Sequence, residues 1–213
     1  MTNSFNLEKL KNWKFLGCFL GILGCLQFII LSITAMVFYP GGYSFWDNFI
    51  SHLGFTRSAN NSQLNTISLI LFLLTMTLTA VFWIPFWLSI RTVFTKTKNL
   101  RYLSWLGTIL GLISSPTLIL IAFFPGDLMY QAHILATMAF FLLFASAMII
   151  YSIVMLLDKD YENYYGYIGF AMAIMLLLYM SIFLLNAAFQ KITVYVLFSW
   201  VIIQGIKLWT ILE

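Results

Sequence analysis

Long uninterrupted apolar runs dominate the chain, and short polar segments separate them. Each run has about 20 residues, the length that an α-helix needs to cross the ~30 Å hydrocarbon core of a bilayer. The runs are continuous, whereas a transmembrane barrel has segments of roughly ten residues with alternating hydrophobicity. The pattern therefore predicts six membrane-spanning helices, near residues 15–38, 65–89, 102–124, 132–157, 165–186 and 192–212.

Composition supports the same class of protein. Hydrophobic residues make up 62% of the 213 residues and charged residues 8%, against about 25% charged residues in soluble domains. The first apolar run is too long for a signal-peptide core of roughly 7–15 residues, so we expect it to be retained. No linker or low-complexity tract divides the chain. We therefore expect an all-α, polytopic membrane protein in which residues 1–213 form one six-helix transmembrane domain.

The positions of the cations predict the orientation of this bundle. Most of them lie in alternate connections, which places them on one side: Lys9, Lys11, Lys14, Arg91, Lys96, Lys98, Arg101, Lys159 and Lys207. Only Arg57 and Lys191 fall on the other side. Because cytoplasmic loops collect positive charge, we expect cytoplasmic termini, outward loops at 39–63, 125–131 and 187–191, and the plasma membrane if the organism is prokaryotic. The basic segment at residues 91–101 is then explained by attraction to anionic lipid head groups, and we assign it no nucleic-acid partner.

The longest predicted connection, residues 40–63, is unusually polar. Structureless loops longer than ~12–15 residues are uncommon, so part of this loop should be ordered. Ser44 is a suitable N-cap, and apolar residues recur at every fourth position from Phe45 to Leu53. This spacing predicts a short interfacial helix over residues 44–53.

Polar residues that can carry chemistry gather in two outward segments. The first loop holds Asp47, Ser51 and His52, and the segment after the third apolar run holds Asp127 and His133. These are the two histidines of the chain. Ionisable residues near membrane depth are rare and are functional candidates by default. We expect the two segments to converge on one outward-facing, ligand-binding pocket.

Three interpretations of these residues stay open. They could anchor the loops structurally, line a binding pocket without catalysis, or form a metal or hydrolytic site. Catalytic zinc takes three protein ligands, for which His52, His133, Asp47 and Asp127 are candidates. An Asp–His pair beside Ser51 could also transfer protons or activate a hydroxyl. No cofactor is required by the sequence, and no H-E-x-x-H or G-x-S-x-G signature is present.

Two further patterns bear on packing and transport. Pro85 and Pro116 lie within predicted helices, where they should cause kinks that are candidate hinges. No charged residue lies at a predicted midplane, which argues against ion-coupled transport. Tryptophans near predicted helix ends are expected to anchor the interfaces: Trp13, Trp46, Trp87, Trp105 and Trp209. Trp83 and Trp200 lie deeper and are expected to be packing residues.

The two polar segments carry the motifs of a known family. The first reads D-x-x-x-S-x-L-G with Asn60 following, and the second is an F-P-x-D turn with a histidine shortly after it: Asp47, Ser51, Leu53, Gly54, Phe124, Pro125, Asp127 and His133. Over residues 38–146 the chain resembles the integral-membrane family of domain of unknown function 998. It is more distantly similar to the Frag1/DRAM/Sfk1 group of six-span proteins. The resemblance implies the architecture, no assigned activity, and a connection with lipids.

The combined expectation is an integral membrane protein with an outward polar pocket that interacts with membrane lipid. The first alternative is a metal-dependent membrane lipid hydrolase that uses the same residues. Alkaline ceramidase-type bundles, which resemble this layout, draw three histidines from separate helices, whereas this chain has two in all. The second alternative is a small-molecule transporter. Enzymatic activity and homo-oligomer formation stay open.

Overall fold

Six long helices make up most of the structure, a computed structural model that describes residues 7–213. They are α1 (Trp13–Val37), α2 (Thr66–Ile90), α3 (Lys98–Phe123), α4 (Tyr130–Leu157), α5 (Asn163–Ser181) and α6 (Ala187–Leu212). The three 3-10 helices are η1 (Leu7–Lys11), η2 (Ile50–Gly54) and η3 (Arg91–Val93). Within residues 7–213 there is no β-strand. The all-α class is therefore confirmed.

The long helices have the length and surface of membrane spans. The candidate spans contain 21–28 residues, with mean hydropathy between 1.6 and 2.5. Large hydrophobic side chains are exposed on their outer faces, for example Ile30, Leu74, Ile113, Leu142, Ile174 and Ile206. A soluble monomer rarely exposes so much contiguous apolar surface, whereas lipid chains accommodate it. The chain is an integral, multi-pass membrane protein with six spans, as the apolar runs predict.

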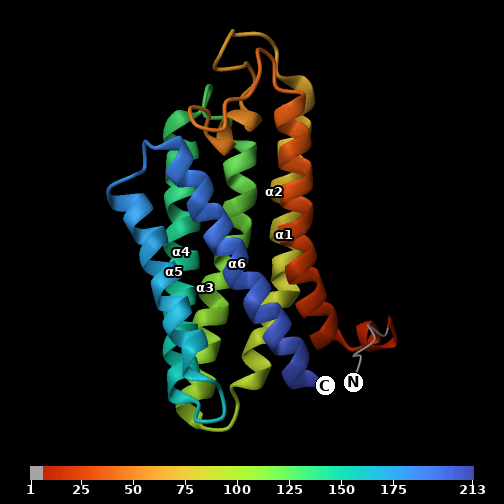
Figure 1. Cartoon of the computed structure of the whole chain (residues 1–213), viewed down its shortest axis with the longest axis vertical. Helices are drawn as coiled ribbons and strands as arrows, with labels where there is room; N and C mark the ends of the chain where they lie inside the picture. The colour runs from red at the N-terminus through yellow and green to blue at the C-terminus, as the bar shows by residue number, and fades with distance from the viewer. Residues whose placement is uncertain (1–6) are drawn as a thin grey trace.

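Alternation of the helices sorts the connections to the two ends of the bundle (Figure 1). The start of α1, the end of α6 and the loops at 91–97 and 158–162 lie at one end, which we call the termini end. The first loop (residues 38–65) and the connections at 124–129 and 182–186 lie at the other, which we call the first-loop end. The assignment of these ends to the two sides of the membrane stays a prediction.

Glycines on one face of α1 let α2 approach closely. A Cβ atom at Gly21 would lie 2.7 Å from the ring of Phe86, and one at Gly24 would lie 3.1 Å from Nε1 of Trp83. Small residues are used at membrane helix interfaces because they permit such close backbone contact. The large rings of α2 therefore fill the space that the α1 glycines leave.

The centre of the bundle is aromatic. The Trp87 ring centroid lies 5.1 Å from that of Phe144 and 5.8 Å from that of Trp200. Trp83 and Trp200 are buried, as expected, but the prediction of Trp87 as an interfacial anchor is wrong, because this side chain is fully buried. The physical reason is the slot at Gly111, where a Cβ atom would lie 2.2 Å from the Trp87 ring.

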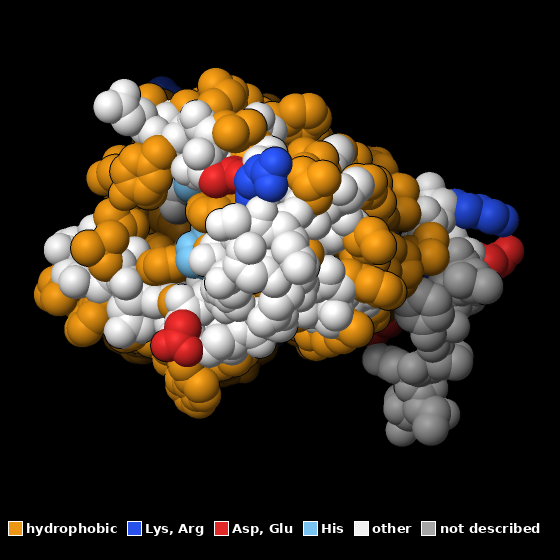
Figure 2. Space-filling view, turned by 90° about the horizontal axis from the view of Figure 1, so that it is seen from above, with side chains coloured by type: hydrophobic (Ala, Val, Ile, Leu, Met, Phe, Trp, Pro, Cys, Tyr) orange, Lys and Arg blue, Asp and Glu red, His pale blue; other side chains and the backbone are white. Residues whose placement is uncertain are grey.

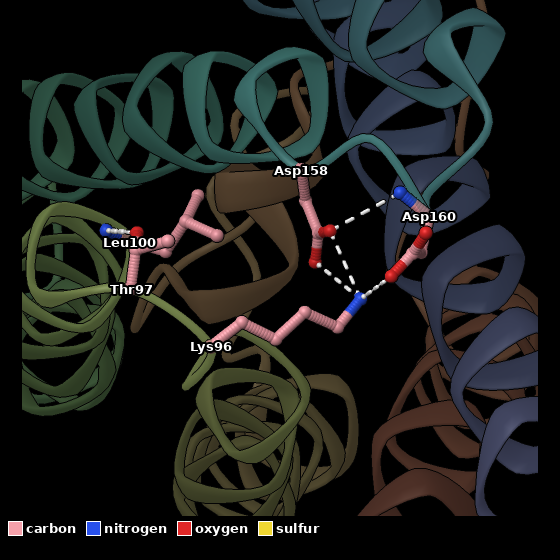
Figure 3. A network of polar contacts seen from close by, with 5 residues as sticks. All are labelled: Lys96, Thr97, Leu100, Asp158 and Asp160. Carbon is pink, nitrogen blue, oxygen red and sulfur yellow. Dashed lines mark hydrogen bonds and ion pairs between the residues drawn. The ribbon is translucent and has the colours of Figure 1, made fainter.

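An ion-pair network closes the termini end (Figure 3). Lys96 Nζ lies 3.0 Å from Oδ1 of Asp158 and 2.6 Å from Oδ2 of Asp160. Asp158 also accepts the backbone N–H of Asp160, and Thr97 caps α3 by accepting the N–H of Leu100. The Lys96 ammonium lowers the pKa of the Asp160 carboxyl. This network joins the α2–α3 connection to the α4–α5 connection.

Only one of the two aspartates in this network should matter for stability. The side chain of Asp158 is 4% exposed and that of Asp160 is 75% exposed. Asp158→Asn should lower the free energy of unfolding by about 1–3 kcal/mol, because it weakens charge-assisted bonds in a buried position. Asp160→Asn should have little effect, because its ion pair is solvated. Thermal unfolding in detergent measures both, and equal shifts of the two variants would contradict this assignment.

Candidate functional site

The first loop enters the mouth of the bundle and is held there by side chains of α2, of α6 and of Asn65, which directly precedes α2. Ile50 and Leu53 of η2 are buried. Gln190 Oε1 accepts the N–H of Ile50 at 2.8 Å. Asn65 Nδ2 and the Ser68 hydroxyl donate to the Leu53 carbonyl at 3.0 and 3.1 Å. Backbone groups that leave water need such partners, so these contacts allow η2 to lie inside the mouth.

The same contacts replace the predicted helix over residues 44–53. The chain instead makes a turn at 45–47 and then the short helix η2. The Asn48 side chain accepts the N–H of Ser44 at 2.8 Å, and the Asn48 carbonyl accepts from a side chain of α6. One local side-chain bond and one bond from the distant helix α6 therefore take the place of a continuous helical ladder, and the local spacing alone does not reveal the bond from α6.

Lys191 ties α6 to the first loop. Its side chain is fully buried, and its ammonium donates to the carbonyls of Asn48 and Ala187. The rings of Tyr43 and Phe45 lie with centroids 5.5 and 5.0 Å from Nζ. Aromatic faces attract a cation through their quadrupole, most strongly where water is excluded. Within residues 7–213 no carboxylate forms a salt bridge with Lys191, so carbonyl groups and aromatic rings hold its charge.

The hydrogen bonds of Asn48 determine which ring nitrogen of His52 carries the proton. The Ser44 N–H can only donate, so the Asn48 side-chain atom that it contacts must be the oxygen, Oδ1. The Asn48 NH₂ group then lies 2.9 Å from Asn60 Oδ1 and 3.3 Å from His52 Nδ1. Nδ1 of His52 is therefore an acceptor, and neutral His52 carries its proton on Nε2.

His133 has the opposite arrangement. Its Nδ1 lies 2.8 Å from the Phe124 carbonyl oxygen, which can only accept, so Nδ1 carries the proton. The neutral form of His133 then presents a lone pair at Nε2. Burial, with smaller contributions from Lys191 and His133, lowers the pKa of His52 to about 4, so His52 is neutral at pH 7.

His52 and His133 line one cavity at the first-loop end, with a volume of about 120 Å³, which we call the histidine cavity. Figure 2 shows histidine surface on this face, among hydrophobic side chains. The wall is mostly aromatic or aliphatic, and its other polar members include Ser51, Thr137 and Gln190. A cavity of this size and polarity has room for several water molecules or for the polar group of a ligand.

A second cavity, which we call the central cavity, lies among α1, α2, α3, α4, α6 and η2. Its volume is about 40 Å³, and its wall includes Phe28, Met76, Trp83, Leu118, Phe141, Val194 and Leu197. Ser51, Thr137 and Gln190 are the polar residues of this wall, and the same three line the histidine cavity. The two cavities therefore adjoin, and polarity falls from the first-loop end toward the bundle interior.

The structure brings together only part of the predicted site. Ser51, His52 and His133 share the histidine cavity, but Asp47 and Asp127 do not line it. The structure thus separates the histidines from the carboxylates. Among residues 7–213 no group of three His, Cys, Asp or Glu residues could hold a metal ion. The zinc hypothesis stays a prediction from the sequence.

Both aspartates bind polar groups of the first loop. The hydroxyl of Ser44 donates to Asp47 Oδ2 at 2.5 Å and in turn accepts the N–H of Asp47. The Asp127 carboxylate accepts the N–H groups of Thr56 and Arg57 at 3.0 and 3.1 Å, which links the α3–α4 connection to the first loop. These contacts match the structural-anchoring interpretation of the two carboxylates.

Gln190 and Lys191 were missed as site residues because they fall within the predicted outward loop 187–191. In the structure α6 begins at Ala187, so both side chains lie on its first turns and point into the bundle mouth. The available signal was Asn186, which caps α6 by accepting a backbone N–H at 2.8 Å. Asparagine is among the preferred N-cap residues.

Comparison with known families now identifies the chain. Residues 22–207 match the family described as "Protein of unknown function (DUF998)". The chain belongs to this family. The match covers the first loop and both histidines of this DUF998 member, and confirms the resemblance seen in its motifs. No curated protein and no solved structure matches.

The assignment of opposite tautomers is open to direct measurement. The chain contains two histidines, so nitrogen NMR of histidine-labelled protein should show two imidazoles. At pH 7 we expect one protonated at Nε2, which His52→Gln should remove, and one protonated at Nδ1, which His133→Gln should remove. Two imidazoles of the same tautomer would contradict the hydrogen-bond assignment.

The stability of the protein should depend on pH through His52. Its pKa lies near 6.5 in the unfolded chain and at about 4 in the folded protein. The unfolded state therefore binds a proton first, and stability should fall as pH is lowered from 6.5 to about 4. The unfolding temperature, measured across this range, should decrease less steeply for His52→Gln than for the unmodified protein. Identical slopes would contradict the burial of a neutral imidazole.

Proposed function

We propose that this DUF998 protein binds a membrane lipid or a lipid-like amphiphile, with the chain in the central cavity and the polar group in the histidine cavity. The change in polarity along two adjoining cavities carries this proposal. Ligand sites typically combine apolar walls with a few polar groups that fix orientation. Here the polar groups lie at one end of the path, which is the distribution of polarity in an amphiphile.

The dimensions of the central cavity favour a narrow ligand. Its volume of about 40 Å³ leaves no room for a fused ring or a pair of chains, so a single unbranched chain could enter only by its end, with the lining side chains moving aside. Met76 lines this cavity, and the unbranched thioether side chain of methionine adapts readily to an irregular occupant. These features support single-chain binding within the bundle rather than on its outer surface.

The same residues support the two alternative functions, a hydrolase and a transporter, less well. A metal-dependent hydrolase would use Asp47 and Asp127, whose carboxylates are engaged by loop hydroxyl and amide groups and lie off the cavity wall. A transporter would need a route past the aromatic centre around Trp87 and Phe144, where side chains are fully buried. Both alternatives stay predictions from the sequence.

Filling the central cavity should remove bound lipid. Leu118 and Leu120 lie on α3, and they are 4% and 42% exposed. Leu118 lines the central cavity, whereas Leu120 lies on an exposed face. Leu118→Trp should reduce the lipid retained by the purified protein about tenfold, because the indole takes the space of the chain. Leu120→Trp is the matched control and should retain lipid like the unmodified protein.

Native mass spectrometry after a delipidating wash measures the retained lipid. Val194→Phe, which adds less bulk from α6, provides a second cavity variant if Leu118→Trp is unstable. Thermal unfolding identifies the variants that remain folded. Equal lipid retention in all folded variants and the control would contradict binding in the central cavity.

A further inference from the structure

The two histidines offer the histidine cavity one donor and one acceptor. Asn48 donates to Nδ1 of His52, so the neutral ring of His52 carries its proton on Nε2. The Phe124 carbonyl accepts from Nδ1 of His133, so the neutral ring of His133 has a lone pair on Nε2. Neither Nε2 atom has a hydrogen-bond partner among residues 7–213. The hydroxyl of Ser51, on the same wall, is also unpaired within this part of the chain. These polar groups line a cavity that opens at the surface, so they are accessible to a ligand that enters it.

The charge of the walls narrows the class of ligand. No Asp, Glu, Lys or Arg lines either cavity. The nearby Lys191 ammonium is already bound by two carbonyls and two aromatic rings. A phosphate, sulfate or quaternary ammonium group would leave water without an opposite charge, which is costly in an apolar site. An uncharged polar group carries no such cost.

We infer that the ligand is a single-chain lipid that carries an uncharged hydroxyl group. Its hydroxyl oxygen accepts the proton of His52 Nε2, and its hydroxyl hydrogen is donated to His133 Nε2. A hydroxyl is the smallest group that satisfies both partners at once. This inference rests on the proposed function for the place of the chain, and it adds the chemistry of the polar group. A long-chain alcohol and a monoacylglycerol share this chemistry.

Trp83 allows the binding of a chain to be followed directly, because its ring lines the central cavity. Bromine quenches tryptophan fluorescence on contact. The probes are ω-bromoundecanol, its sulfate ester and the glycerol monoester of ω-bromoundecanoic acid, each added to the full chain in lipid nanodiscs. Quenching that disappears in Trp83→Phe reports a chain in the central cavity and separates it from probe dissolved in the bilayer.

We expect the alcohol to bind at least tenfold more tightly than its sulfate. His52→Phe and His133→Phe should each weaken alcohol binding about tenfold, the change expected for one lost hydrogen bond. Tyr102→Phe is the control, since it removes a hydroxyl from a side chain on α3 that is 71% exposed and lines neither cavity. This variant should bind the alcohol like the unmodified protein.

A second measurement avoids variants that fold poorly. In the unmodified protein, saturating alcohol should shift the Nε2 signals of both imidazoles in nitrogen NMR, and the sulfate should shift neither. If the glycerol monoester also binds, the site accepts monoacylglycerols. If the monoester does not bind, the site takes a free alcohol.

The outcomes that overturn the inference differ from those that overturn the proposed function. Equal quenching by alcohol and sulfate, or unchanged imidazole signals with bound alcohol, would contradict hydroxyl recognition and leave chain binding intact. Absence of quenching that depends on Trp83, for every probe, would contradict the lipid-binding proposal itself.

Discussion

The pairing of backbone groups in the first loop is the constraint on which the rest of the site depends. A loop that enters the mouth of a membrane bundle loses water, and its N–H and C=O groups must find partners in protein. Gln190 supplies an acceptor for Ile50, while Asn65 and Ser68 supply donors for Leu53. These contacts fix η2 and thereby bring a histidine of the first loop to the same cavity as a histidine of α4.

Groups behind the two imidazoles give the site its chemical character. The Asn48 amide and the Phe124 carbonyl each bind Nδ1, so the neutral forms of the two rings differ in which nitrogen is protonated. The aspartates that would have charged such a site are used elsewhere, since Asp127 binds the amides of Thr56 and Arg57. The result is a histidine cavity lined by polar but not by charged side chains, above an apolar interior.

The six spans and the grouping of both histidines at one end could be predicted because continuous apolar length and alternation of helices determine them. The role of Asp127 and the form of the first loop could not. Each depends on contacts between segments distant in sequence, such as Lys191 with Asn48. Trp87 was misplaced for a similar reason, because the slot that buries it is a glycine on another helix, Gly111.

An experimental structure of the full chain in lipid nanodiscs, determined with bromoundecanol present, tests the central claim most directly. The account predicts density for the hydroxyl between the imidazoles of His52 and His133, continuing past Ser51 to bromine beside Trp83. It is contradicted if the first loop lies away from Gln190 with the two imidazoles on separate surfaces, or if bromine density is confined to the outer faces of the helices.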